Sequence, residues 1–240
     1  MQLSTLLLLA SFSALAISVK DSRGFRTLGC DVRAVYEFPN ETYVENLAVR
    51  SNGQIIMSAV TEPNLYMIDP LIGGVPAIVY TFPEVIGLSG IAEYKPDVFA
   101  VITGNYTLAT ANAVQGSWSV WSVDLNGISL GPNNTLTSLP KVEKITTIAE
   151  AIFLNGMSIL SESDGTVLIG DVAAGDIWRL SISSGESEIA IQNNFTAPAL
   201  APPFSNAGVD GLRIRDGFLS QTPGNPRTPQ TAHLRHHIGP

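Results

Sequence analysis

One sequence pattern occurs four times in this chain and limits its fold more than any other feature. Each copy begins with a polar residue and then a small or polar one, mostly glycine, and continues as a short alternating strand, a turn and a second apolar strand. The copies begin at Glu45, Ser89, Asn155 and Asp210. Three of the turns are Asn-Gly or Asp-Gly, which indicate β-hairpins because both turn residues need positive φ. The pattern therefore predicts four hairpins.

Further strands are expected after the first three hairpins. Third strands are predicted at 64–70, 117–125 and 176–182, and fourth strands at 77–82 and 187–191. Units of four strands with variable loops are typical of β-propeller blades. An ordinary β-sandwich would not need the same pattern, with a polar residue at its head, four times. We predict an all-β chain of about three and a half propeller blades, in which 141–153 suits a short helix or a strand and loop equally well.

The residues that begin the four copies are the first candidates for a functional site. The innermost strands of a propeller run along its central channel, so these four residues would converge there. Two carboxylates and an asparagine suit Ca²⁺ or Mg²⁺, whereas in a dry pocket one carboxyl could act as an acid or base. Asn or Asp before Gly can also be a simple cap of a turn or strand. We take Glu45, Asn155 and Asp210 as candidate catalytic and metal-binding residues.

Other side chains are weaker candidates. Glu93 and Asp171 are expected near the ends of inner strands. Trp118, Trp121 and Trp178 are expected to pack between blades rather than to bind a ligand. The sequence contains no GxSxG elbow, phosphate loop, cysteine-rich metal motif or HExxH motif.

The amino-terminal residues predict export. An apolar run followed by Ala14-Leu15-Ala16 is typical of a secretory signal, which we place at residues 1–16. Four N-glycosylation sequons agree with export, at Asn40, Asn105, Asn133 and Asn194. The single cysteine, Cys30, excludes an internal disulfide, and we interpret it as a small buried residue. We expect a protein that is secreted or resides in the lumen of the secretory pathway, without a membrane anchor.

Composition excludes several classes of partner. A hydrophobic content of 45% with 14% charged residues is typical of a packed globular core. The net charge of −8 disfavours nucleic acids and anionic membrane surfaces. We therefore expect a small-molecule substrate and no nucleic-acid partner, and the sequence indicates no protein partner.

The carboxyl-terminal residues do not continue the pattern. Residues 221–240 contain no acid but all three histidines, His233, His236 and His237. We assign 30–219 to an incomplete propeller and 220–240 to an irregular tail, and we interpret the change at Ser220 as a truncation, frameshift or retained intron. A metal site in such a proline-rich tail is a weak alternative.

The leader and the repeats resemble a known family. ENLAVRSNGQIIMS, GLSGIAEYKPDVFAVITGN, LNGMSILSESDGTVLIGDVAAGDIWRLSISSGE and GVDGLRIRDGFL are similar to the secreted fungal branch of the SMP-30/gluconolactonase/LRE-like six-bladed propellers. The resemblance covers about 30–219. It implies either a metal-dependent lactone hydrolase or a hetero-Diels–Alderase of tropolone–sesquiterpenoid (meroterpenoid) biosynthesis.

The resemblance implies different chemistry for the same residues. Lactone hydrolases of the family hold a divalent metal, Ca²⁺ or Zn²⁺, and Glu45 and Asn155 match two of their ligands. The remaining ligands match less well, because Ser89 replaces an asparagine and Asp210 stands where branch members usually have asparagine. Cyclisation needs no cofactor, since it depends on positioning and hydrogen bonding. We expect hetero-Diels–Alder-type cyclisation first, lactone hydrolysis second, and a non-catalytic or inactive truncated remnant third.

Overall fold

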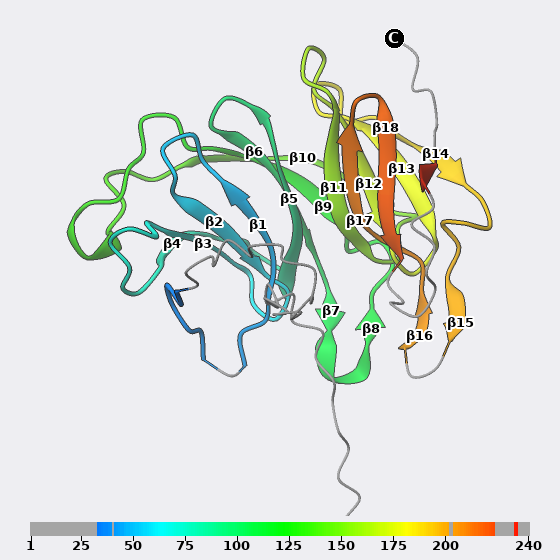
Figure 1. Cartoon of the computed structure of the whole chain (residues 1–240), viewed down its shortest axis with the longest axis horizontal. Coiled ribbons are helices and arrows are strands. Elements are labelled where there is room, and N and C mark those ends of the chain that lie inside the picture. The colour runs from blue at the N-terminus through cyan, green and yellow to red at the C-terminus, as the bar shows by residue number, and fades with distance from the viewer. Residues whose placement is uncertain (1–32, 40, 202–203, 224–232, 235–240) are drawn as a thin grey trace, which may run out of the picture. The chain divides into compact units, whose positions relative to one another are not determined.

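The computed structural model describes residues 33–39, 41–201, 204–223 and 233–234 (Figure 1). The chain divides into two units, Met1–Ala34 and Val35–Pro240, and every described strand belongs to the second. The expected signal segment, Cys30 and Asn40 lie outside the described residues.

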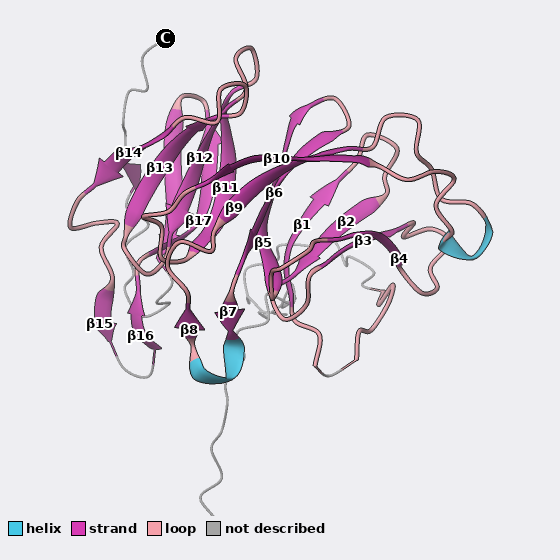
Figure 2. Ribbon diagram, turned by 180° about the vertical axis from the view of Figure 1, so that it is seen from behind, coloured by secondary structure: helices cyan, strands magenta, loops and turns pink. Residues whose placement is uncertain are grey.

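Three antiparallel sheets of four strands form most of the second unit (Figure 2). Sheet 1 pairs its strands in chain order, β1 Val44–Val49, β2 Ile55–Ala59, β3 Asn64–Ile68 and β4 Ala77–Thr81. Sheet 2 contains β5 Gly87–Lys95, β6 Val98–Gly104, β9 Ser119–Asp124 and β10 Lys141–Thr147. Sheet 3 contains β11 Leu154–Ser161, β12 Thr166–Asp171, β13 Asp176–Ser181 and β14 Ser187–Gln192. The third and fourth strands that we predicted lie within a residue or two of these bounds.

A fourth sheet continues the series with three strands. It pairs β17 Val209–Arg215 with β18 Phe218–Pro223, and β18 with the short β19 His233–Leu234. We had expected the strand pattern to end at Ser220. The structure instead continues β18 to Pro223 and draws two residues of the expected irregular tail into the sheet, because pairing with β17 and β19 satisfies backbone groups whatever the side-chain pattern.

Short elements interrupt the sheets. A small hairpin, β7 Tyr106–Thr107 and β8 Asn112–Ala113, extends between β6 and β9 and carries the 3₁₀ turn η1 Leu108–Thr110. A second turn, η2 Pro132–Asn134, lies between β9 and β10, and β15 Ala199–Ala201 pairs with β16 Phe204–Ala207. The ambiguous residues 141–153 form strand β10 followed by loop, and not a helix.

The first strands of the four sheets lie side by side, β1 against β5, β5 against β11 and β11 against β17 (Figure 1). Glycine permits this close approach. A Cβ at Gly90 would lie 2.2 Å from the carbonyl oxygen of Asn155, and one at Gly156 would lie 2.1 Å from that of Asp210. This is why glycine follows the polar residue in these copies, and the arrangement is that of a partial β-propeller.

Apolar side chains fill the spaces between successive sheets. The cluster between sheets 2 and 3 includes Trp118, Trp178 and Ile169, all almost fully buried. A second cluster joins sheets 1 and 2, with Trp121 packed against it, and a third joins sheets 3 and 4 around Leu212. The expectation that the three tryptophans pack between blades is confirmed.

Candidate functional site

The axial cluster consists of Glu45, Asn155 and Asp210, the residues that we selected from the heads of three repeats. The side-chain amide of Asn155 donates one hydrogen bond to Glu45 Oε1 at 2.9 Å and another to Asp210 Oδ1 at 2.8 Å. The amide oxygen of Asn155 faces Asn46 Nδ2 at 3.4 Å. Residues from sheets 1, 3 and 4, far apart in sequence, thus share one hydrogen-bonded centre.

The two carboxyls of the cluster are hard to ionise. Burial raises the pKa of Glu45, the hydrogen bond from Asn155 lowers it in part, and the charge of Asp210 raises it again. Burial also raises the pKa of Asp210. Two acids that share one neutral amide favour binding a proton, and raised pKa values of this kind are frequent at functional sites.

The fourth repeat head, Ser89, supports the cluster without joining it. Its hydroxyl donates to the carbonyl oxygen of Leu154 at 2.8 Å, and its own carbonyl accepts from the hydroxyl of Ser58 at 2.5 Å. Ser89 is fully buried. Its side chain therefore ties β5 to β11 and fixes the strand that carries Asn155.

Two tyrosines near the cluster lie outside the repeated pattern, so the sequence did not indicate them. Burial raises the pKa of Tyr43, as do the charges of Glu45 and Asp210 and, to a smaller extent, Tyr106. Burial and the charge of Glu45 likewise raise the pKa of Tyr106. Neither hydroxyl makes a hydrogen bond to another described residue. Both phenols remain protonated at neutral pH, since each pKa lies above its ordinary value of 10.0.

The two weaker acidic candidates have structural contacts. Glu93 is exposed and accepts the backbone N–H of Asp97 at 2.7 Å, which fixes the turn between β5 and β6. Asp171 is fully buried and accepts backbone N–H groups from Ile152, Phe153, Ala173 and Ala174 at 2.8–3.2 Å. These bonds hold the loop before β11 against the loop after β12.

The axial cluster does not fit a divalent cation as it is arranged. A hard cation needs converging oxygen atoms, whereas Asn155 turns its amide nitrogen toward both carboxyls and its oxygen toward Asn46. A cation at this point would require the amide to turn over. Elsewhere in the described part of the chain, no three His, Cys, Asp or Glu residues form a group that could hold a metal ion.

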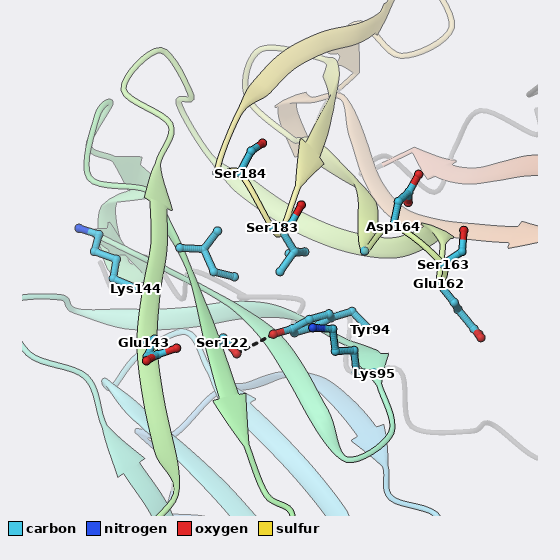
Figure 3. Close-up of a pocket in the computed structure, with 14 residues that line it drawn as sticks. Tyr94, Lys95, Ser122, Glu143, Lys144, Glu162, Ser163, Asp164, Ser183 and Ser184 are labelled. Carbon is cyan, nitrogen blue, oxygen red and sulfur yellow. Dashed lines mark hydrogen bonds between the residues drawn. The ribbon is translucent and has the colours of Figure 1, made fainter.

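A separate groove of about 560 Å³ lies between sheets 2 and 3 (Figure 3). Sheet 2 contributes Tyr94, Lys95, Ser122, Glu143 and Lys144, and the loops of sheet 3 contribute the rest of the labelled residues, Glu162, Ser163, Asp164, Ser183 and Ser184. The Tyr94 and Ser122 hydroxyls are 2.7 Å apart. None of the residues selected from sequence lines this groove.

The described sequons differ in exposure. Asn133 and Asn194 are exposed, and Asn133 has a left-handed φ of 58°. Asn105 is half-buried, and its side-chain oxygen accepts the backbone N–H of Ile86 at 2.9 Å. No helix in the described ranges is long and apolar enough to cross a membrane.

Two curated proteins are similar to most of the chain. A protein from Phoma sp, provisionally named a hetero-Diels-Alderase, is 25% identical over 216 residues, which are 82% of this chain and 59% of the relative. A protein from Sarocladium schorii with the same provisional name is 24% identical over 211 residues, 78% of this chain and 49% of the relative. The chain thus spans about half the length of the curated relatives it matches. No family model matches the sequence.

Solved structures are similar to this chain only at low identity and low TM-score. The crystal structure of a nidogen/laminin complex matches 76% of this chain at 10% identity and a TM-score of 0.49, and an aldose sugar dehydrogenase from Streptomyces coelicolor with bound PQQ matches 79% at 18% identity and a TM-score of 0.46. Both TM-scores lie below 0.5, so the fold assignment rests on the strand pairing of this chain. Strand pairing and sequence similarity together confirm the resemblance to the propeller branch that includes fungal hetero-Diels–Alderases.

Proposed function

We propose that this chain takes part in hetero-Diels–Alder-type cyclisation, with the axial cluster at the reaction centre. The similarity over about four-fifths of the chain to two proteins named for this reaction carries the proposal. The cluster supports it, since residues from three sheets meet at one hydrogen-bonded centre.

The reaction asks for position and polarisation. An α,β-unsaturated carbonyl, such as a quinone methide, supplies four atoms and an alkene supplies two. One carbon–oxygen and one carbon–carbon bond form, three π bonds become one, and no proton or electron is gained or lost. Holding the two partners together removes an entropic barrier, and a hydrogen bond to the carbonyl oxygen stabilises the charge that develops on it. We propose that no cofactor is required.

The donor to that oxygen would come from a carboxylic acid or a phenol. Both amide hydrogens of Asn155 are already given to Glu45 and Asp210. Because burial raises the pKa of both carboxyls, we propose that one of them carries the proton that it donates. The hydroxyls of Tyr43 and Tyr106 are the other available donors. In this proposal Asn155 positions the carboxyls and does not bind the substrate.

The proposal is tested by measuring the rate of adduct formation and the ratio of the two enantiomers of the adduct. An ortho-quinone methide generated in solution with excess alkene gives a racemic adduct, so an enriched enantiomer formed faster than background would report catalysis by the full chain. Glu45→Gln keeps the shape but removes the acid, and we expect it to reduce the enrichment. A racemic product at the background rate, from folded wild-type protein, would contradict the proposal and favour a non-catalytic protein or an inactive remnant.

Lactone hydrolysis is the second candidate from the sequence, and no contact in the cluster favours it. Hydrolysis of simple lactones that required added Ca²⁺ or Zn²⁺ and was abolished by Glu45→Gln would replace cyclisation as the proposed activity. Binding of either ion would also raise the unfolding temperature of the wild type and not that of Glu45→Gln.

We further propose that the protein is secreted and acts in fungal specialised metabolism on meroterpenoid or polyketide substrates. The leader and the sequons support export. Of the described sequons, Asn133 and Asn194 offer the most accessible side chains. Mass spectrometry of protein from a fungal culture medium, before and after enzymatic deglycosylation, tests both export and glycan position.

A further inference from the structure

Three aromatic rings form a row that leads toward the axial cluster. Trp118 and Phe153 have ring centroids 5.0 Å apart at 34°, and Phe153 and Tyr106 are stacked with centroids 4.5 Å apart at 17°. Phe153 is the middle ring because it contacts both neighbours. Gly104 makes room for the row, since a Cβ there would lie 2.3 Å from the Trp118 ring.

Burial decreases along this row. Trp118 is 1% exposed, whereas Phe153 and Tyr106 are half-buried. Among the described residues, the Tyr106 ring stacks only on Phe153, and its hydroxyl has no hydrogen-bond partner. The row therefore ends at Tyr106, one of whose faces is not occupied by another ring.

The Tyr106 end of the row lies within electrostatic reach of Glu45. The charge of Glu45 acts on the phenol of Tyr106, and Phe153 is two residues before Asn155 in the chain. Tyr106 begins the β7–β8 hairpin, which lies outside the four-stranded sheets and packs on Phe153, the residue before β11. A flat ligand on Tyr106 would thus lie on the side of the axial cluster that carries Glu45.

We propose that Tyr106 is the binding platform for a planar, conjugated and oxygenated ring, which stacks as the fourth member of the row with its oxygen toward the axial cluster. A conjugated carbonyl ring is electron-poor and stacks well on an electron-rich phenol. That this ring is the heterodiene rests on the proposed function, whereas its binding does not.

Equilibrium binding of a stable probe tests the platform without turnover. The probe is ortho-hydroxyacetophenone, a flat ring that carries a conjugated carbonyl and a hydroxyl, and calorimetry measures its Kd with the full chain. Tyr106→Leu removes the stacking surface, and we expect the Kd to rise roughly 2- to 10-fold, the value of one aromatic pair. Tyr106→Phe keeps the ring, and its Kd should stay within about twofold of wild type.

Tyr80 provides a matched control. It is a half-buried tyrosine on β4, the outermost strand of sheet 1, and its ring centroid lies 4.9 Å from that of Phe82. No described contact joins it to the axial cluster. Tyr80→Leu should leave the Kd unchanged. Near-ultraviolet circular dichroism and thermal unfolding would check that each variant is folded, and Tyr106→Phe supports the comparison if Tyr106→Leu fails that check.

Each outcome decides the proposal. The proposal would be overturned if the probe did not bind to the wild type, if its Kd were unchanged in Tyr106→Leu, or if its Kd rose equally in Tyr80→Leu. A Kd that rose as much in Tyr106→Phe as in Tyr106→Leu would show that the hydroxyl binds the probe and the stacked ring does not. Cyclisation is scored separately. Enantiomeric enrichment that persists in Tyr106→Leu keeps the proposed function and shows that the ring bound on Tyr106 is not the heterodiene, whereas Tyr106-dependent binding with a racemic product keeps the platform and rejects the function.

Discussion

Two buried polar clusters join sheet 1 to the sheets that follow it, and their charges are balanced differently. Arg50, which follows β1, donates to both carboxylate oxygens of Asp97 at 2.8 and 2.5 Å, to Gln54 at 2.7 Å, and to the carbonyl oxygens of Leu125 and Ile128 at 3.0 Å. Its cation is paired and its guanidinium is surrounded by acceptors. The axial cluster contains two acids, one neutral amide and no cation.

The difference separates a structural cluster from a candidate reaction centre. A buried ion pair whose donors are satisfied holds its position, and removing one partner leaves an uncompensated charge. Burial raises the pKa of both acids around the amide, and the charge of Asp210 raises that of Glu45 further, so neither acid has a cation that favours its ionised form. The Arg50–Asp97 pair thus fixes sheet 1 against sheet 2. The axial cluster, in contrast, has acids that are not paired with a cation and could take part in a reaction.

The largest effect on stability is expected from breaking the Arg50–Asp97 pair. Asp97 lies in a turn with φ of 62°, which asparagine tolerates, so Asp97→Asn removes charge with little backbone strain. The buried guanidinium loses its counter-ion, and we expect the free energy of unfolding to fall by about 3 kcal/mol. Urea denaturation measures it. The exposed Arg179–Glu188 pair is the control, and Glu188→Gln should cost less than about 1 kcal/mol. Equal losses in both variants would remove the distinction.

Asn155→Leu should be the next most harmful change. It deletes both hydrogen bonds to the carboxyls and leaves Glu45 facing Asp210 without a donor, at a cost of about 2 kcal/mol at neutral pH. The loss should be smaller at pH 5, where more of the carboxyls are protonated. Asn64→Leu is the matched control, because Asn64 also bonds a carboxylate, Glu62, but at the half-buried start of β3 and away from the axial cluster. A loss that did not depend on pH would show that Asn155 is a packing residue.

Glu45→Gln should change the slope of stability with pH more than stability itself. A carboxyl whose pKa is raised on folding stabilises the native state most below its unfolded pKa, and this contribution is lost as pH rises through the folded pKa. Stability should therefore fall from about pH 4 upward, and Glu45→Gln should flatten part of that fall. Thermal unfolding across pH measures it, with exposed Glu188→Gln as the control. A parallel pH curve in Glu45→Gln would contradict the raised pKa.

The sequence pattern that occurs four times was sufficient to predict which residues meet at the centre of the fold. The polar residue before glycine marked the start of each inner strand, and close packing of these strands brings Glu45, Asn155 and Asp210 together. Their catalytic and metal-binding roles remain predictions. Ser89 has the same place in the pattern, but its short side chain bonds the neighbouring backbone and does not reach the cluster.

Residues outside the repeats could not be placed from sequence. Tyr43 precedes the first copy and Tyr106 lies in a short hairpin with no equivalent in the other units, so periodicity gives no indication that both lie near Glu45. The Arg50–Asp97 pair was also missed, because Asp97 had the ordinary features of a turn. The extension of β18 past Ser220 depends on backbone pairing of Gln221 and Pro223 with β17, which apolar alternation does not report.

The smallest effect is expected in the groove between sheets 2 and 3, which is polar, mixed in charge and open. Tyr94→Phe removes the hydroxyl contact with Ser122 and should cost about 1 kcal/mol of stability. Cyclisation and the Kd of ortho-hydroxyacetophenone should not change, because no groove residue belongs to the axial cluster or to the aromatic row. Ser122→Ala, which deletes the other half of the contact, should behave in the same way. If a folded Tyr94→Phe variant lost enantiomeric enrichment, the reaction centre would have to be placed in the groove. The raised pKa values of the two carboxyls in the axial cluster would then need a different explanation.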